Sequence, residues 1–202
     1  MIENIDFTAP NEPLPLFAEW FALAQQHEPN DPNAMTLATV GTDGAPSARI
    51  MLMKGYDASG FTFFTNRQSH KGNQLAQRQQ AALCFHWKSL RRQVRIEGDV
   101  APVSDSESDE YFATRPRGSQ IGAWASQQSR PLASRAALEE CIAEVERRYA
   151  GQPVPRPPHW GGYRVTPRRI EFWQDREFRL HDRIIYTRDD ANAPWRCERF
   201  FP

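Results

Sequence analysis

The sequence predicts a mainly β protein of the α+β class: an antiparallel barrel with a few helices at its periphery. Two observations carry this prediction. Most apolar segments are short, alternate with polar residues and are bounded by turn residues, which is typical of antiparallel strands. The segments with a helical period are few and do not alternate regularly with strands, which argues against a doubly wound parallel sheet. No repeat or long linker divides the 202 residues, so we expect one domain over 1–202.

Charge and cysteine content exclude several classes of protein. The 25 Lys and Arg residues balance 25 Asp and Glu residues, whereas general nucleic-acid binders are usually strongly basic, so we expect no nucleic-acid partner. The three cysteines have no metal-ligand spacing and are odd in number, which predicts no metal site and a reducing compartment. We find neither a signal peptide nor an apolar run near the ~18–20 residues that span a bilayer. We therefore predict a cytoplasmic protein with no membrane partner.

The first third of the chain predicts one helix followed by strands. Residues 1–12 are typical of a loose leader, and apolar residues at helical spacing predict a helix over 16–26. Alternating residues then predict an antiparallel meander. Its strands are expected at 34–40, 47–54 and 61–65, with turns at 41–44 and 57–60.

The remaining two thirds mix helices and strands. Helices are expected at 69–80, 104–114, 118–124 and 134–149. A proline-rich crossover is expected at 151–159. Strands are expected at 81–87, 93–103, 163–166, 169–173, 182–187 and 195–200.

The junction between the second and third of these helices gathers groups that bind anions. Tyr111 and Arg115 are four residues apart and share a helix face. Pro116 ends that helix, and Ser119 lies where the next begins. A phenol, a guanidinium, a hydroxyl and free backbone N–H groups around one point would form an oxyanion or phosphate cradle. The residues alone leave a turn with two solvated arginines as an equal alternative.

Two further segments carry basic groups next to strands. On the strand from Arg49 to Lys54 the two charges would face opposite sides, so an ordinary buried strand with charged ends is the favoured interpretation. At 64–71 a strand end runs into a helix start that carries His70 and Lys71, an arrangement that suits a phosphate. A solvated first turn is the favoured alternative there.

Arg179, His181 and Arg183 are spaced by two, so on an extended strand all three would project from one face. Such a row favours an anionic ligand, because solvated faces usually mix charges of both signs; a solvated surface row is the alternative. The common nucleotide and hydrolase motifs are absent, and no Ser/His/Asp set can be assembled. Many anion-binding groups without a nucleophile suit an enzyme whose chemistry comes from a phosphorylated cofactor.

Seven stretches have the order and spacing of one known family. They are residues 49–55, 64–66, 92–98, 115–126, 157–165, 170–174 and 179–183. Through them the sequence resembles the pyridoxamine 5'-phosphate oxidase family of vitamin B6 metabolism over roughly residues 14–200. The resemblance implies an FMN-binding split β-barrel that works as a homodimer, with each FMN between subunits. It also implies oxidation of pyridoxine or pyridoxamine 5'-phosphate by O2, with hydride transfer from C4' to flavin N5. The products would be pyridoxal 5'-phosphate and hydrogen peroxide, with ammonia from the amine.

The same resemblance implies the site residues. FMN is expected at Arg49, Ile50, Met51, Leu52, Met53, Lys54, Phe64, Thr65, His70, Lys71, Gln93, Gln128, Ser129, Trp173 and Arg183. The substrate phosphate is expected at Lys54, Tyr111, Arg115 and Ser119. Arg179 and His181 are expected over the substrate ring as the catalytic pair, and Asp31 matches a family carboxylate near the active site.

One departure and two alternatives remain. The family usually has arginine where this chain has His70, so we expect weaker FMN binding. A flavin oxidase of the phenazine type would need no substrate-phosphate clamp, so Tyr111, Arg115 and Ser119 argue against it. A non-catalytic carrier of FMN or pyridoxal phosphate could lose the ring-facing pair, which this chain retains.

Overall fold

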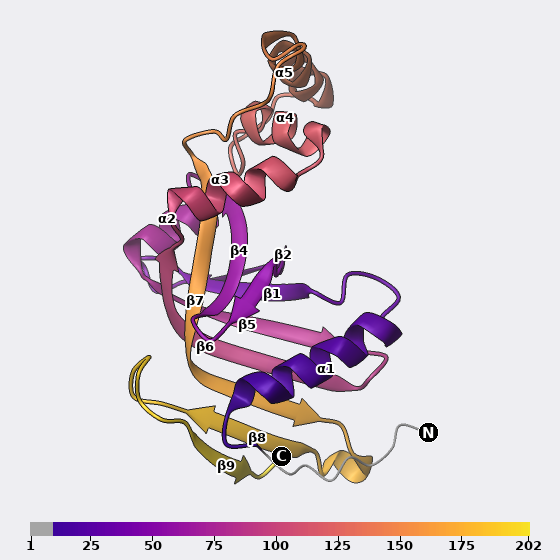
Figure 1. Ribbon diagram of the computed structural model, residues 1–202, viewed down its shortest axis with the longest axis vertical. Helices are drawn as coiled ribbons and strands as arrows, with labels where there is room; N and C mark the ends of the chain where they lie inside the picture. Colours follow the sequence, from indigo (N-terminus) through magenta and orange to yellow (C-terminus); the bar gives the residue numbers. More distant parts are fainter. Residues whose placement is uncertain (1–9) are drawn as a thin grey trace.

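The computed structural model describes residues 10–202, so the predicted loose leader falls almost entirely outside the described residues. The described chain forms a curled nine-stranded sheet in the order β2-β1-β5-β6-β7-β4-β3, with β8 paired to β7 and β9 to β8 (Figure 1). All of its strand pairs are antiparallel, which confirms the predicted fold class. The strands are β1 (Ala34–Val40), β2 (Pro46–Leu52), β3 (Gly55–Asp57), β4 (Gly60–Asn66), β5 (Gln80–Trp87), β6 (Arg92–Pro102), β7 (Trp160–Gln174), β8 (Asp182–Thr187) and β9 (Arg196–Phe200).

The helices lie around this sheet. They are α1 (Pro13–His27), α2 (His70–Gln77), α3 (Asp105–Thr114), α4 (Arg117–Ala125), α5 (Arg135–Arg148) and the 3-10 turn η1 (Glu177–Arg179). Ser69, Ser104 and Ser134 cap α2, α3 and α5 by accepting a backbone N–H bond three residues on. Helices α3 to α5 extend beyond one end of the sheet, whereas α1 lies across its lower part (Figure 1). No helix of the described chain is both long and apolar enough to cross a membrane.

The predicted meander is wrong in its strand partners. The hairpins β1–β2 and β3–β4 form, but β2 and β3 lie at opposite ends of the strand order. The chain crosses between them at Met53, whose N–H donates to Asn33 O at 2.9 Å, and Lys54, whose N–H donates to Thr62 O at 2.8 Å. Strand β4 pairs with β7, which is distant in sequence. Local alternation identifies a strand but not its partner, so the sequence pattern could not show this crossing.

The two strands predicted at 163–166 and 169–173 are one continuous strand, β7. Pro167 lies between the two predicted strands, and proline has no N–H to donate to a ladder. In the structure Pro167 lies where the register with β6 shifts between Glu97 and Gly98, so its missing donor falls at a bulge. A Cβ at Gly98 would lie 2.1 Å from Thr166 O, so the close approach of the two backbones there requires glycine.

The main core lies between α1 and the sheet. The apolar face of α1, predicted by its spacing, is buried. Phe17 contacts Phe61 with ring centroids 4.9 Å apart, and Trp20 contacts Phe172 at 5.3 Å. A second, smaller cluster forms where α3 and α4 meet the start of β7, and contains Phe112, Ile121, Val154 and Trp160. The single-domain organisation stays a prediction.

Candidate functional site

A cavity of about 700 Å³ lies between β2, β4, α3 and α4. Lys54, Tyr111, Arg115 and Ser119 all line it, so the structure brings together the whole group expected around an anion. The prediction of free N–H groups is wrong at Ser119, whose N–H donates to Pro116 O at 2.8 Å. At Ser119 the hydroxyl, and not the backbone N–H, is therefore the group left to bind an anion.

A stack of aromatic rings forms one wall of this cavity. Phe64 lies 4.1 Å from Tyr111 and 5.4 Å from Trp160, measured between ring centroids, and the three rings are nearly parallel. Gly162 is opposite Phe64 in the sheet, and a Cβ there would lie 2.7 Å from the Phe64 ring. The Arg115 guanidinium lies over Trp160, 4.7 Å from the ring centroid. Stacking on the tryptophan thus fixes the arginine without using its hydrogen-bond donors.

The cations of this cavity have no carboxylate partner in the described part of the chain. Neither Lys54 nor Arg115 forms an ion pair with an Asp or Glu there. Burial lowers the pKa of Arg115, although the nearby Tyr111 acts in the opposite direction. Its Nη1 atom is buried without a hydrogen-bond partner in residues 10–202. An arginine stays protonated in proteins, so the cavity wall carries uncompensated positive charge that suits an anionic ligand.

Lys71 is a second centre of positive charge, next to the same cavity. Its Nζ lies 3.3 Å from Thr65 Oγ1 and 3.1 Å from Gln128 Oε1, and both partners line the cavity. Burial, and then the charge of Arg49, lower the pKa of this lysine. Its side chain is buried, so the alternative of a solvated helix start is wrong at this residue. His70, by contrast, lines a separate cavity of about 430 Å³ beside the β1–β2 turn.

Strand β2 is not the buried strand that we favoured from sequence. It lies at the edge of the sheet, and Ile50 is 66% exposed. Ile50, Met51 and Leu52 line the main cavity, whereas Met53 is buried in the core. The strand ends at Leu52, so strand alternation does not extend to Lys54 and cannot assign its face. Arg49 does not line the cavity and donates instead to Leu37 O, Ser47 Oγ and Thr39 Oγ1.

Arg179, His181 and Arg183 do not form the predicted row on one strand. Arg179 belongs to η1, and β8 begins only at Asp182. Phe178 and Arg179 have φ angles of 56° and 63°, so two successive left-handed residues turn the chain before the strand starts. Spacing by two predicts a shared face only for extended backbone, and this backbone is not extended. Arg179 is exposed and has no ion-pair partner within 10–202.

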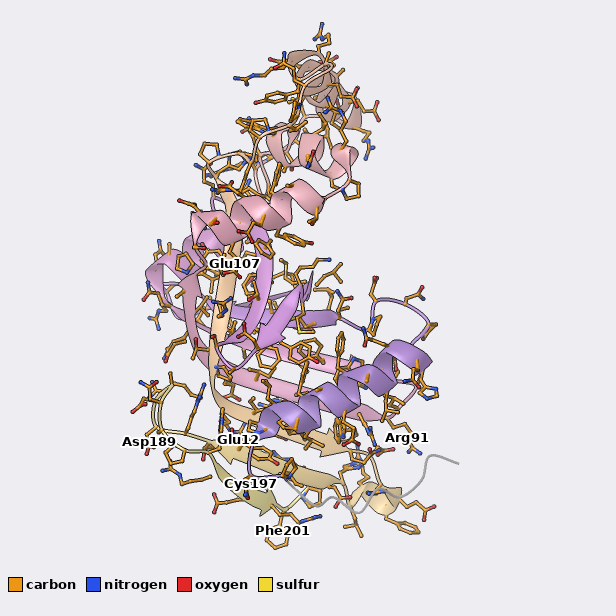
Figure 2. All side chains as sticks on the ribbon, viewed as in Figure 1. Glu12, Arg91, Glu107, Asp189, Cys197 and Phe201 are labelled. Carbon is orange, nitrogen blue, oxygen red and sulfur yellow. The ribbon has the colours of Figure 1, made fainter. Side chains whose placement is uncertain are left out.

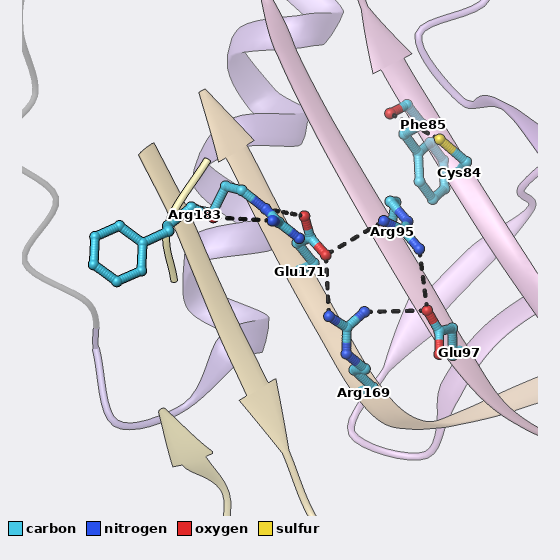
Figure 3. Close-up of polar contacts among 8 residues, drawn as sticks. Cys84, Phe85, Arg95, Glu97, Arg169, Glu171 and Arg183 are labelled. Carbon is cyan, nitrogen blue, oxygen red and sulfur yellow. Dashed lines mark hydrogen bonds and ion pairs between the residues drawn. The ribbon is translucent and has the colours of Figure 1, made fainter. Parts of the chain in front are cut away.

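Arg183 is fixed by a buried carboxylate that the sequence analysis missed (Figure 3). Its Nε donates to Glu171 Oε1 at 2.8 Å, while Glu171 Oε2 accepts from Arg169 at 3.1 Å and from Arg95 at 3.5 Å. Burial alone would raise the pKa of Glu171, but the bond and charge of Arg183 and the charges of Arg95 and Arg169 together lower it. Arg183 Nη1 also donates to Phe201 O at 3.0 Å. Glu171 directly opposes Arg95 across β6 and β7, a signal that is visible only once the strand register is known.

The other expected residues do not line the main cavity. Gln93 opposes Trp173 across β6 and β7, and the Trp173 ring lies 4.7 Å from that of His181. Ser129, with φ of 69°, is exposed and outside the main cavity. Asp31, with φ of 41°, is exposed in the turn before β1. In the part of the chain that the structure describes, no three His, Cys, Asp or Glu side chains gather to hold a metal ion.

Within one copy, the residues that line the main cavity are separated along the sheet from Trp173, His181 and Arg183. Strand β7 begins at Trp160, which lines the main cavity, and reaches Trp173 thirteen residues later. At ~3.3 Å per residue this is about 40 Å along the strand. In Figure 2, Glu107 on α3 lies above Arg91, and Phe201 lies at the lower end of the molecule. Within one copy, His181 and Arg183 line a cavity separate from the main one.

Comparison with known proteins gives consistent matches along the chain. The family model described as pyridoxamine 5'-phosphate oxidase matches residues 23–149, and that of the pyridoxine 5'-phosphate oxidase C-terminal dimerisation region matches 160–202. The chain is 61% identical over 197 residues to the pyridoxine/pyridoxamine 5'-phosphate oxidase of Rhodopseudomonas palustris (strain HaA2), covering 98% of this chain and 93% of that one. It is 56% identical to the protein of the same name from Brucella canis, with 98% and 97% covered.

Solved structures agree with this fold. The structure of PhzG from Burkholderia lata 383 in complex with tetrahydrophenazine-1-carboxylic acid is 32% identical, with a TM-score of 0.91 and both chains covered completely. A pyridoxamine 5'-phosphate oxidase-related, FMN binding protein from Nostoc punctiforme has a TM-score of 0.75 at 18% identity, with 96% of this chain and 100% of that one covered. At that identity the second likeness supports the fold alone.

Proposed function

The chain belongs to the pyridoxamine 5'-phosphate oxidase family of oxidoreductases, and from this premise we propose that it makes pyridoxal 5'-phosphate with FMN as cofactor. Pyridoxine 5'-phosphate and O2 would give pyridoxal 5'-phosphate and hydrogen peroxide. Pyridoxamine 5'-phosphate, O2 and water would give the same two products and ammonia. The observation that carries the proposal is the cavity where Lys54, Tyr111, Arg115 and Ser119 meet without a carboxylate.

These four side chains would hold the substrate phosphate. Arg115 supplies a planar, permanently charged group. Stacking on Trp160 orients this group, so its N–H donors are not needed to hold it in place. Lys54 adds a second charge, and the Tyr111 and Ser119 hydroxyls add hydrogen bonds. Clamping the phosphate fixes one end of the substrate, which restricts how its ring can lie in the cavity.

The residues around Lys71 fit the phosphate of FMN. A buried ammonium surrounded by a hydroxyl and an amide, with the charge of Arg49 close by, is a donor set typical of a phosphate site. Beside it, Ile50, Met51 and Leu52 could contact the rest of the cofactor. When bound, FMN would supply the acceptor of the substrate's hydride. His70 faces another cavity, so we do not include it among the proposed FMN ligands.

A homodimer would complete the site. The C-terminal 43 residues match a dimerisation region, and both the loop around η1 and the end of the chain expose large apolar side chains. Phe178 is 87% exposed and Phe201 is 93% exposed. We infer that this end of one copy covers the cavity of the other, and so brings Gln93, Trp173 and Arg183 to the cofactor.

Arg179 and His181 would then act on the substrate ring. Arg179 has no carboxylate partner in the described chain, so its charge remains available to favour the deprotonated form of the substrate oxygen or amine. His181 can exchange a proton with that same group. Both roles require the ring to be held in one orientation, which the phosphate clamp at the other end provides.

The test is to add FMN to the purified protein and follow pyridoxal 5'-phosphate formation from pyridoxamine 5'-phosphate in air. We expect turnover with the phosphorylated amine and at least about 100-fold lower kcat/KM with unphosphorylated pyridoxamine, because the charged clamp would be unused. A yellow protein that does not turn over would contradict the proposal and favour a carrier. The likeness to PhzG makes an oxidase of a larger aromatic acid the second candidate, which turnover of tetrahydrophenazine-1-carboxylic acid would identify.

A further inference from the structure

The Nδ1 atom of His181 lies between a hydrogen-bond donor and a carboxylate, which favour opposite protonation states of this nitrogen. The backbone N–H of Arg176 points at it from 3.1 Å, and Asp175 Oδ1 lies 2.9 Å away. The N–H requires a lone pair on Nδ1, whereas the carboxylate is best satisfied by a proton there. A neutral imidazole carries only one proton, so whichever neighbour prevails also decides the state of Nε2.

Asp175 is held in place independently of His181. Its own N–H donates to Arg91 O at 3.0 Å, and its second carboxylate oxygen forms an ion pair with the Arg91 guanidinium. Arg91 lies in the turn between β5 and β6, so this contact ties the loop after β7 to another part of the sheet. The Asp175 side chain is only 16% exposed, which limits competition from water. Trp173 packs on the imidazole ring and restricts its rotation.

The other ring nitrogen is open. His181 lines a cavity of about 330 Å³ together with Arg183 and Phe201. Within residues 10–202 the structure gives Nε2 no hydrogen-bond partner, since both contacts of this side chain are made through Nδ1. Nε2 is therefore the atom that can meet a ligand.

We propose that Asp175 is a positioning residue that keeps the proton of neutral His181 on Nδ1 and so leaves a lone pair on Nε2. The importance of that lone pair rests on the proposed function. When an alcohol or amine is oxidised at C4', its O–H or N–H bond must break as the hydride leaves. Nε2 with a lone pair can form the new N–H bond to that proton, whereas Nε2 that already carries hydrogen cannot. Without the carboxylate, the Arg176 N–H would take the Nδ1 lone pair and move the ring proton to Nε2.

The proposal is tested on the ligand-free protein by nitrogen NMR. With 15N-labelled histidine, two-bond proton–nitrogen correlations show which ring nitrogen carries the proton, and His181→Gln identifies the signals of this residue. At a pH where the ring is neutral, we expect Nδ1–H in the wild type and Nε2–H in Asp175→Asn. Arg91→Ala is the matched control: it removes the other partner of Asp175 and should keep Nδ1–H. The same tautomer in wild type and Asp175→Asn, or Nε2–H in the wild type, would overturn the proposal.

Kinetics of the FMN-loaded enzyme then connect the tautomer to the reaction. We expect Asp175→Asn to lower kcat about 100-fold, in the range of lost acid–base catalysis, with KM for pyridoxamine 5'-phosphate within about 3-fold. Asp175→Glu keeps the carboxylate and should recover most of kcat, which also covers the case in which the asparagine variant fails to fold. A tautomer switch in a protein with no oxidase activity would remove the proposed function and leave the role of Asp175 intact. Full turnover in Asp175→Asn would remove that role alone.

Discussion

Arginines are held in two different ways in the main cavity and in the loop after β7. In the cavity, Arg115 rests on Trp160 and pairs with no carboxylate in the described chain. In and beside the loop, Arg176 pairs with Asp182 at 2.6 Å and Arg183 with Glu171 at 2.8 Å. An arginine held by stacking keeps its hydrogen-bond donors for a ligand, whereas an arginine held by carboxylates has used part of them to fix its own geometry. The comparison therefore separates an arginine whose donors remain for a ligand from arginines that use part of their donors to fix their own position.

The largest effect is expected from the stacked arginine. Arg115→Ala should lower kcat/KM for pyridoxamine 5'-phosphate about 1000-fold, mostly through KM, because a charge-assisted phosphate contact is lost and each 1.4 kcal/mol is tenfold. The kcat/KM of Arg115→Lys should lie between those of the wild type and Arg115→Ala, since lysine keeps the charge but not the planar guanidinium. Arg117→Ala is the control: within residues 10–202 that exposed arginine donates only to the Tyr149 and Gln152 carbonyls. An unchanged KM in Arg115→Ala would place the substrate phosphate elsewhere.

The exposed arginine of the loop should affect turnover alone. Arg179→Ala is expected to lower kcat about 100-fold, on the scale of one lost catalytic group. FMN affinity, measured by the change in flavin fluorescence on titration, should stay within about 3-fold, because Arg179 does not line the main cavity in its own chain. Its lack of an ion pair in the described chain also predicts an unchanged unfolding midpoint. Wild-type turnover would remove Arg179 from the mechanism.

The buried carboxylate should affect stability. Glu171→Gln is expected to lower the free energy of unfolding by about 2 kcal/mol, less than for a fully buried pair because its arginines are partly exposed. The pKa of Glu171 is lowered on folding, so its contribution is present above the unfolded-state pKa and is lost as pH falls through the folded-state pKa. The difference in unfolding free energy between the wild type and Glu171→Gln, measured by urea unfolding, should thus be largest at pH 7 and should vanish in acid.

Glu97→Gln is the matched control for that experiment. Glu97 pairs with the same Arg95 and Arg169, but its side chain is 44% exposed. We expect a loss below about 1 kcal/mol, as for other exposed pairs. Equal losses in the two variants would mean that burial adds nothing to this network.

The smallest effect is expected at His70. Because His70 lines a separate cavity, His70→Arg should change FMN affinity by less than about 3-fold, whereas Lys71→Met should weaken it by at least about 30-fold through the loss of a buried charge contact. This differs from the expectation drawn from sequence, which assigned weaker FMN binding to the histidine. Tenfold tighter binding in His70→Arg would show that position 70 does reach the cofactor.

The sequence predicted the features that depend on residues close together in the chain, and missed those that depend on distant residues. Helical spacing and caps are local, and the helix capped by Ser104 and ended before Pro116 formed as expected. The cradle around Arg115 was likewise encoded within a few residues. The partner of β4, the crossing at Lys54 and the network of Glu171 depend on strand register, which alternation does not contain. The predicted row of Arg179, His181 and Arg183 on one strand face was wrong, because residue spacing does not reveal the two left-handed residues that turn the chain there.

The long strand β7 has a consequence for how the protein is made. Its partners β4, β6 and β8 span the chain from Gly60 to Thr187. During synthesis from the N-terminus, β4 and β6 therefore leave the ribosome well before the strand that joins them. Until Trp160–Gln174 emerges, apolar residues such as Phe63 and Val94 have no finished core to enter. The nascent chain thus carries an incomplete sheet for most of its translation, a period in which chaperone binding would protect it from aggregation.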